Sequence, residues 1–291
     1  MDTADHCLDL VRRFDADRYL AALFAPEAAR PALLALAAFG IEIARVRESV
    51  REVLPGEIRL QWWRDTLEHR QPSGHPVADA LLEAIARYSL PVPALIGVID
   101  AHTFDLYDDA MPDLNEMEGY AGETAGALIQ LGAIVLAGGR DPGTGTLAGH
   151  AGAALTLCRV VQGVPRASAR GQLFLPGDVL ARHGADPAAV RAGTDSPALR
   201  AALGEMIAHA RHHLDRVGPI GRAVPPAAVP AFLPLSGTLP LLNRLQTSRT
   251  DPLHTITEMP ALPRLWRMWR FAAQGRRRLK RTGGPDGQAQ G

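Results

Sequence analysis

Apolar residues recur at three- and four-residue spacing along nearly the whole chain. This is the period of an amphipathic helix, whereas the alternating runs rich in Val, Ile and Thr that indicate strands are absent. Clusters of Pro and Gly, such as the stretch from Pro225 to Pro240, should interrupt the helices. The pattern predicts an all-α fold of about eight to ten helices.

The spacing of these helices favours one domain. No interval between them is long and polar enough for a linker, so we expect a single helical domain over residues 1–274. From Gly275 onward the composition shifts to Arg, Gly and Gln without apolar periodicity. Residues 275–291 are therefore predicted to form a basic, Gly-rich disordered tail.

Composition limits the classes of partner and the compartment. Hydrophobic residues make up 47% of the 291 residues, and 31 Lys and Arg balance 31 Asp and Glu. A chain without net charge has no global field to attract nucleic acid, so we expect no nucleic-acid partner. Cys7 and Cys158 lack metal-ligand spacing and suit a reducing compartment, and the acidic N-terminus lacks a signal-peptide pattern. We expect a cytoplasmic protein.

Two segments bear on membrane contact. The uncharged stretch from Thr124 to Gly139 is shorter than the roughly 20 residues that a membrane span needs, so it should be a buried helix. The basic run from Arg276 to Arg281 follows Trp266 and Trp269. It is either a solvated tail or a peripheral contact with an anionic membrane, which would place the protein at the inner face of that membrane.

Four collinear segments carry a resemblance to a known family. They read AAFGIEIARVRESV followed by LQWWRD, then DLNEMEGYAGETAGALIQL, AGAALTLCRVVQGV and ARGQLFLP. In order and spacing they resemble the squalene/phytoene synthase family from about Asp17 to about Leu175, with a weaker helical continuation to Phe271. The resemblance implies an isoprenoid-synthase helical bundle around a central cavity. Active members of this family join two prenyl diphosphates head to head.

Active members need carboxylates for a physical reason. Ionisation of an allylic diphosphate leaves negative charge, which a cluster of Mg²⁺ ions neutralises as a Lewis acid. Mg²⁺ prefers hard oxygen ligands in octahedral geometry. The family therefore carries acidic residues one helical turn apart on two facing helices.

The matching positions in this chain are degenerate. Anchoring on LQWWRD puts the first acidic motif at residues 44–49, where Ala44 and Arg45 replace acids and Glu48 is the remaining carboxylate. Anchoring on ARGQLFLP puts the second motif at Arg159, Gly163 and Ala167. Arg45 and Arg47 would place positive charge where divalent cations sit. We therefore expect no cofactor, and Mg²⁺ only if the protein is an active prenyltransferase.

The retained features belong to the scaffold. They include Tyr120, the small residues Gly122 and Gly126, and the RGQLFLP turn at 170–176. Together with RTDPLH at 249–254, the degenerate pattern is most similar to the branch of NADH dehydrogenase (ubiquinone) complex I assembly factor 6. That branch keeps the fold without a demonstrated need for synthase chemistry. The resemblance implies a non-catalytic assembly or stability factor, with respiratory complex I subunits or assembly intermediates as partners.

Two other functions stay open. Arginines near the family's cavity mouth either form surface salt bridges or create a metal-free basic pocket for a prenyl or lipid phosphate. The pocket candidates are Glu42, Arg47, Arg64, Tyr120, Arg166, Arg170 and Gln172. The other alternative is a prenyltransferase that condenses isoprenoid diphosphates with a rearranged acidic site. Its metal candidates, Asp105 and Asp109, would share one helix face, although a solvated helix end explains them better.

Histidine and tryptophan clusters complete the candidate chemistry. His209, His212 and His213 have a spacing that would let two imidazoles meet a metal, but no third ligand accompanies them. We expect them on a solvent-facing helix. Trp62 and Trp63 are predicted to pack in the core rather than to form a stacking platform.

Overall fold

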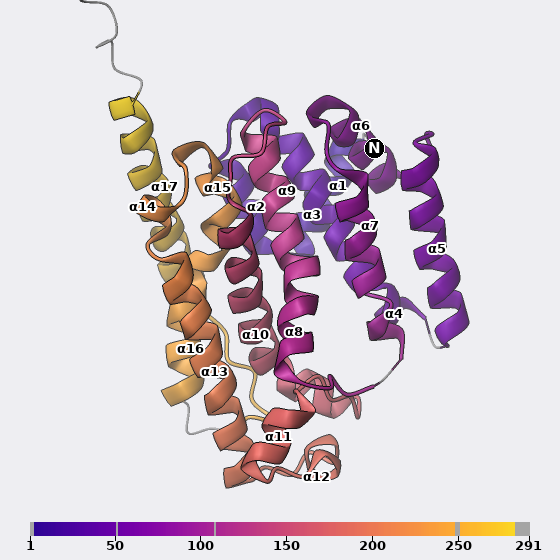
Figure 1. The fold of residues 1–291 in the computed structure, drawn as a ribbon, viewed down its shortest axis with the longest axis vertical. Helices are drawn as coiled ribbons and strands as arrows, with labels where there is room; N and C mark the ends of the chain where they lie inside the picture. The colour runs from indigo at the N-terminus through magenta and orange to yellow at the C-terminus, as the bar shows by residue number, and fades with distance from the viewer. Residues whose placement is uncertain (1–2, 51, 108, 248–250, 283–291) are drawn as a thin grey trace, which may run out of the picture.

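The computed structural model describes residues 3–50, 52–107, 109–247 and 251–282, and within these ranges the regular elements are all helices. Figure 1 shows them running mostly along the long axis of the molecule. The all-α prediction is confirmed. The N-terminal half contains α1 (Thr3–Phe14), α2 (Ala16–Leu23), the 3₁₀ turn η1 (Glu27–Ala29), α3 (Arg30–Ala44), α4 (Val46–Ser49), α5 (Val53–His69), α6 (Pro76–Tyr88), α7 (Val92–Ala101) and the 3₁₀ turn η2 (Phe104–Leu106).

The second half begins with a nearly continuous helical rod. It comprises α8 (Leu114–Ala121), the π-helical turn η3 (Gly122–Gly126) and α9 (Ala127–Leu136). The elements that follow are α10 (Gly145–Ala169), α11 (Gly177–His183), α12 (Pro187–Arg191), α13 (Pro197–Val217), α14 (Ile220–Ala223), η4 (Pro226–Ala228), α15 (Val229–Phe232), η5 (Leu233–Gly237), α16 (Thr238–Thr247) and α17 (Ala261–Thr282). The uncharged stretch from Thr124 to Gly139 thus lies mainly in α9.

The helices of the structure are more numerous than the sequence predicts, and one proline-rich stretch interrupts them as expected. The described residues form 17 α-helices, more than the eight to ten predicted; ten of them have ten or more residues, and the others have eight or fewer. The expected interruption from Pro225 to Pro240 is confirmed, because no long helix crosses it: the stretch forms the short elements η4, α15 and η5 before α16 begins at Thr238. Its prolines occupy first-turn positions, where a missing N–H costs little.

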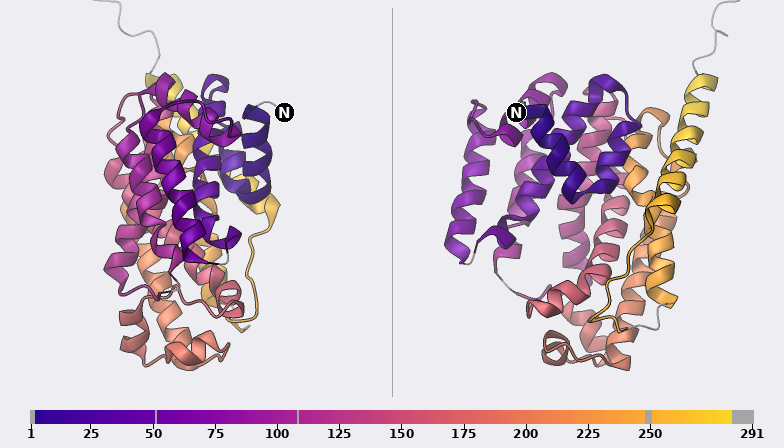
Figure 2. Two further views of the ribbon diagram at one scale, coloured as in Figure 1. Left: turned by 90° about the vertical axis from the view of Figure 1, so that its right-hand side faces the viewer. Right: turned by 180° about the vertical axis from the view of Figure 1, so that it is seen from behind.

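Helix α10 is the central element, and it packs against α13 on one side and against α8, η3 and α9 on another (Figures 1 and 2). The approach to η3 is backbone to backbone, since a Cβ added to Gly152 would lie 2.4 Å from the amide nitrogen of Gly126. Gly126 is therefore a packing glycine, as its sequence context predicted. Gly122 is not, because a Cβ there would meet nothing within 4 Å.

Three clusters of buried apolar side chains fill the space between the helices. The first cluster lies between α1, α3, α5, α6 and α7. The second lies between α8, α10, α11, α13 and α16, and the third is covered by α15 and α17. Trp63 is 1% exposed and packs edge-on against Phe39, which confirms its core position. Trp62 is 37% exposed, so its predicted burial is wrong; its ring rests on Trp63 and His75 at the surface.

Helix α17 crosses the predicted boundary between domain and tail. It continues through Thr282, and Gly275 is buried against Val229 of α15. Its inner face also buries Met268 and Ala272, which supplies the packing that the tail composition did not reveal. The prediction of disorder from residue 275 is therefore wrong for Gly275–Thr282, and residues 283–291 lie outside the described residues.

Candidate functional site

A cavity of about 720 Å³ opens between α3, α4, η3 and α10, within the size range of small-molecule sites. Its apolar lining comes from several helices and from the segment after α10, and includes Met111, Met117, Leu128, Val160, Val164 and Phe174. Its polar lining includes Arg18, Arg47, Glu48, His102, Asp105, Tyr120, Arg159, Arg166, Arg170 and Gln172. The cavity therefore has an apolar wall and a strongly basic one.

The first predicted motif lies where α3 gives way to α4. Ala44 and Glu48 line the cavity with Arg47, whose Nη1 donates to the carbonyl of Val50 at 3.4 Å. Arg45 lies elsewhere: its guanidinium sits 3.8 Å from the ring centroid of Phe14 and pairs with Glu48 at 3.5 Å. The expectation that Arg45 occupies the cavity is therefore wrong, because the aromatic face of α1 holds its side chain.

The second predicted motif lies on α10. Arg159, Gly163 and Ala167 follow one another at four-residue spacing, so they share one helix face, and all three line the cavity. Residues of both degenerate motifs therefore line the same cavity.

A buried ion group lies behind this wall and was missed by the sequence analysis. Asp15 caps α2 by accepting from the backbone N–H of Arg18 at 3.0 Å. Its other oxygen lies 3.2 Å from Nη1 of Arg18 and 3.3 Å from Nη2 of Arg159. The Asp15 side chain is 10% exposed and that of Arg18 is 15% exposed. An aspartate directly before a helix signals a cap, but nothing in the sequence pairs it with α10.

The electrostatics of this group follow from burial and pairing. Burial would raise the pKa of Asp15, but Arg159, Arg18 and the cap hydrogen bond outweigh it, so the pKa is lowered. Burial lowers the pKa of the Arg18 guanidinium, opposed by Asp15. For neighbouring Asp17, burial prevails over Arg264, 3.3 Å away, and the pKa is raised. Arg159 is therefore partly neutralised by a structural carboxylate.

The remaining arginines leave the basic wall with excess positive charge. Arg170 donates to Glu48 at 3.1 Å, and Arg166 lies 3.9 Å from Glu258, with both arginine side chains more than half exposed. The described lining residues include five arginines and two carboxylates, Glu48 and Asp105, and two further carboxylates, Asp15 and Glu258, pair with three of these arginines from outside the lining. Gln172 also lines the cavity. A wall of this kind attracts an anion.

The carboxylate of Asp105 belongs to a compact hydrogen-bonded cluster. The hydroxyl of Tyr120 donates to it at 3.0 Å, and Nδ1 of His102 lies 2.6 Å from the same oxygen. Burial, together with Asp105, raises the pKa of Tyr120 well above its ordinary value. The predicted shared helix face of Asp105 and Asp109 is wrong, because η2 ends at Leu106 and Tyr107 takes an extended conformation. Asp109 is exposed and is not among the lining residues.

Two other candidates lie outside the cavity lining. Glu42 is 3.9 Å from Arg59, and Arg64 donates to Asp100 at 2.6 Å and to Thr103 at 3.3 Å. The side chain of Glu42 is thus directed toward α5, and that of Arg64 toward α7. Their place in the predicted pocket was therefore wrong.

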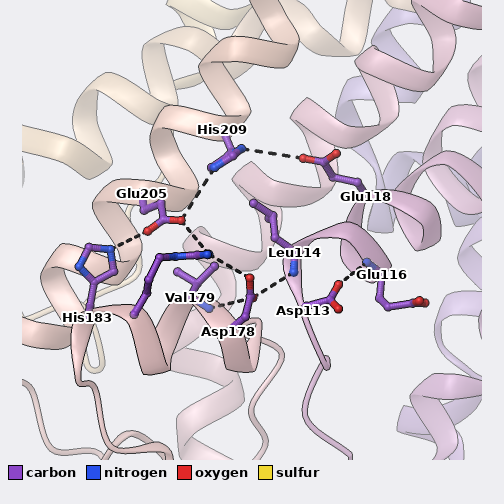
Figure 3. Close-up of polar contacts among 10 residues, drawn as sticks. Asp113, Leu114, Glu116, Glu118, Asp178, Val179, His183, Glu205 and His209 are labelled. Carbon is purple, nitrogen blue, oxygen red and sulfur yellow. Dashed lines mark hydrogen bonds and ion pairs between the residues drawn. The ribbon is translucent and has the colours of Figure 1, made fainter.

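His209 of α13 joins α8 and α11 in a polar network (Figure 3). His209 lies 3.9 Å from both Glu118 and Glu205, and Glu205 also contacts His183 at 2.7 Å. His213 is 8% exposed and lies 3.0 Å from Glu118, so its predicted solvent exposure is wrong. In the described part of the chain, no group of three or more His, Cys, Asp or Glu has the arrangement to hold a metal ion.

The residues at the two motif positions do not fit a magnesium cluster. Glu48 is the one carboxylate among the positions 44, 45, 48, 159, 163 and 167, and it is already paired with Arg45 and Arg170. A Mg²⁺ cluster needs several hard oxygen ligands from two facing helices. The other carboxylate among the described lining residues, Asp105, is hydrogen-bonded to Tyr120 and lies 2.6 Å from Nδ1 of His102.

Known proteins are similar to this chain over most of its length. The sequence model described as squalene/phytoene synthase matches residues 11–270. The chain is 32% identical over 252 residues to NADH dehydrogenase (ubiquinone) complex I, assembly factor 6 from Mus musculus, covering 86% of this chain and 75% of that protein. It is 26% identical over 210 residues to a phytoene synthase from Thermus thermophilus, covering 70% of each.

A solved structure gives the same picture of the fold. The crystal structure of a squalene synthase from Alicyclobacillus acidocaldarius superposes with a TM-score of 0.74, at 20% identity, over 84% of this chain and 93% of that one. The predicted isoprenoid-synthase fold is thereby confirmed.

Proposed function

The chain belongs to the squalene/phytoene synthase family, and on that premise we propose that it is a non-catalytic member that assists the assembly or stability of respiratory complex I. The observation that carries the proposal is the donor set of the two motif positions, with arginine, glycine and alanine where metal chemistry needs carboxylates. The choice of complex I rests on the similarity of this chain to complex I assembly factor 6. Its partners would be complex I subunits or assembly intermediates.

This function needs protein contact rather than turnover. The cavity would then be a feature of the family fold without a catalytic role, and the protein would act without Mg²⁺ or another cofactor. We place it in the cytoplasm at the inner face of the membrane that holds complex I. In the described residues, no helix has the length and apolarity to cross a bilayer.

Gene deletion tests the proposal. Membranes of the deletion strain should lose NADH:quinone activity and accumulate incomplete complex I, and the wild-type gene should restore both. Activity of another respiratory enzyme in the same membranes serves as the control. Intact and fully active complex I in the deletion strain would contradict the proposal.

The basic wall favours a second candidate, a metal-free site for an amphiphilic phosphate. Arg47, Arg166 and Arg170 would take the anionic group, while Met117 and Phe174 would shelter an apolar tail. Farnesyl diphosphate should then stabilise the protein against heat equally well with EDTA and with Mg²⁺. Arg166→Gln is the most informative variant, because the ion pair that Arg166 makes among the described residues is long, 3.9 Å from Glu258. Absence of saturable binding in both buffers would end this idea.

A further inference from the structure

Helix α17 has two apolar faces, and the bundle covers only one of them. Met268, Ala272 and Gly275 point inward, and Arg264 is tied to Asp17 at 3.3 Å. These contacts fix the rotation of the helix about its own axis. The opposite face is therefore presented outward at the edge of the molecule (Figure 1).

The outward face carries large apolar side chains. Leu262 is 79% exposed, Trp266 is 56% exposed and Trp269 is 58% exposed, with Leu265 beside them at 36%. Spacings of four and three residues place Leu262, Trp266 and Trp269 in one stripe. Tryptophan and leucine at such positions are typical of helices that lie in a membrane interface.

The charge of α17 matches one kind of surface. Residues 261–282 contain eight basic residues and no Asp or Glu: Arg264, Arg267, Arg270, Arg276, Arg277, Arg278, Lys280 and Arg281. Among those whose side chains are described, Arg270 and Arg277 are exposed and lie seven residues apart, on the same side of the stripe. The guanidinium of Arg270 lies 5.0 Å from the ring centroid of Trp266. Apolar and cationic groups thus face outward together.

We propose that this outward face of α17, comprising Leu262, Leu265, Trp266, Trp269, Arg270 and Arg277, docks on an anionic lipid bilayer. The apolar stripe enters the head-group region, and the arginines contact lipid phosphates. A protein partner would also cover apolar side chains, but the absence of any acid along α17 favours an anionic surface. The proposal rests on the proposed function only in identifying the membrane as the one that holds complex I.

Vesicle binding tests this surface. Purified protein is sedimented with phosphatidylcholine vesicles that contain or lack phosphatidylglycerol, and tryptophan emission is recorded. We expect binding and a blue shift only with phosphatidylglycerol, weakened by salt. Replacing both tryptophans (Trp266→Ser with Trp269→Ser) should weaken binding at least tenfold. The matched control is Leu54→Ser with Ile58→Ser, which removes two side chains that are 62% exposed on α5 and should change nothing.

Charge variants separate lipid from other partners. Arg270→Gln with Arg277→Gln should weaken binding about 30-fold, from roughly 1 kcal/mol for each basic residue. Arg87→Gln with Arg140→Gln, at exposed positions elsewhere, should have no effect. Absence of vesicle binding, or equal binding by the tryptophan variant, would overturn the proposal. So would self-association that the tryptophan variant abolishes, since a second copy would then cover this face. Vesicle binding is scored without complex I, so its failure leaves the deletion result standing.

Discussion

The buried ion group of α2 offers a quantitative test of the basic wall. Asp15→Asn keeps an oxygen to cap the helix but removes the charge that two arginines share. Arg18, whose side chain is 15% exposed, then loses the carboxylate with which it forms its ion pair. Removing one partner of a buried ion pair destabilises a protein by about 3–5 kcal/mol. We therefore expect Asp15→Asn to lower the free energy of unfolding by roughly 3 kcal/mol.

Urea titration followed by circular dichroism at pH 7 measures this loss. Asp186→Asn is the matched control, because Asp186 caps α12 through the N–H of Ala188 at 2.9 Å and is exposed. It should cost less than about 0.5 kcal/mol, as surface substitutions do. A double-mutant cycle with Arg159→Gln should show coupling, because Arg159 shares the same carboxylate oxygen.

The pH dependence has a definite sign. The pKa of Asp15 is lowered in the folded protein, so its contribution is present above the unfolded pKa of about 4 and is lost as pH falls through the folded value. The gap between wild type and Asp15→Asn should therefore close in acid. If Asp15→Asn costs no more than Asp186→Asn, or if the gap is unchanged at low pH, the ion-group argument is refuted.

Three further predictions concern packing, thiols and the cavity tyrosine. Gly152→Ala should lower the free energy of unfolding by about 3 kcal/mol or more, because the new Cβ meets the backbone of η3. Gly149→Ala on the same helix is the control: its Cβ meets nothing within 4 Å, so it should raise the free energy of unfolding by roughly 0.5–1 kcal/mol. Equal urea midpoints for the two variants would contradict this. Burial raises the pKa of Cys7 to about 11 and that of Cys158 to about 12. Thiol reagents at pH 8 should therefore label both cysteines only after unfolding. Rapid labelling of the folded protein would contradict their burial. Tyr120→Phe removes the hydrogen bond to Asp105 and should lower the free energy of unfolding by about 1 kcal/mol. Because the pKa of Tyr120 is raised well above its ordinary value, the variant should leave the tyrosine ionisation near pH 10 unchanged in absorbance titrations. Loss of part of that ionisation step would contradict the raised pKa.

Much of the fold could be predicted because periodicity is a local property. The spacing of apolar residues identified the helices, and the close contact of Gly126 with α10 followed from its small-residue context. The prolines from 225 to 240 mark the predicted interruption, but the short turns within it were not predicted, because a proline that starts a helical turn looks the same in sequence as one that ends it. The end of α17 was misjudged because its inner contacts, such as Gly275 with Val229, are made with a distant segment.

The relative placement of the second motif's residues could be predicted because helical spacing alone determines it. Arg159, Gly163 and Ala167 share a face of α10 whatever surrounds them, and they line the cavity. Arg45 and Arg64 were misplaced because a long arginine side chain follows its nearest partner, here Phe14 and Asp100. The pairing of Asp15 with α10 could not be found, since it depends on tertiary contact.

Complementation with carboxylate variants tests the central claim most directly, because it requires no knowledge of a substrate. Glu48 and Asp105 are the carboxylates among the described residues that line the cavity. The deletion strain is given Glu48→Gln or Asp105→Asn, each first checked for folding by circular dichroism, and NADH:quinone activity is measured in its membranes. A non-catalytic role predicts that both folded variants restore activity to the wild-type level. Failure of either folded variant, together with pyrophosphate release from farnesyl diphosphate and Mg²⁺ by the wild type alone, would contradict it.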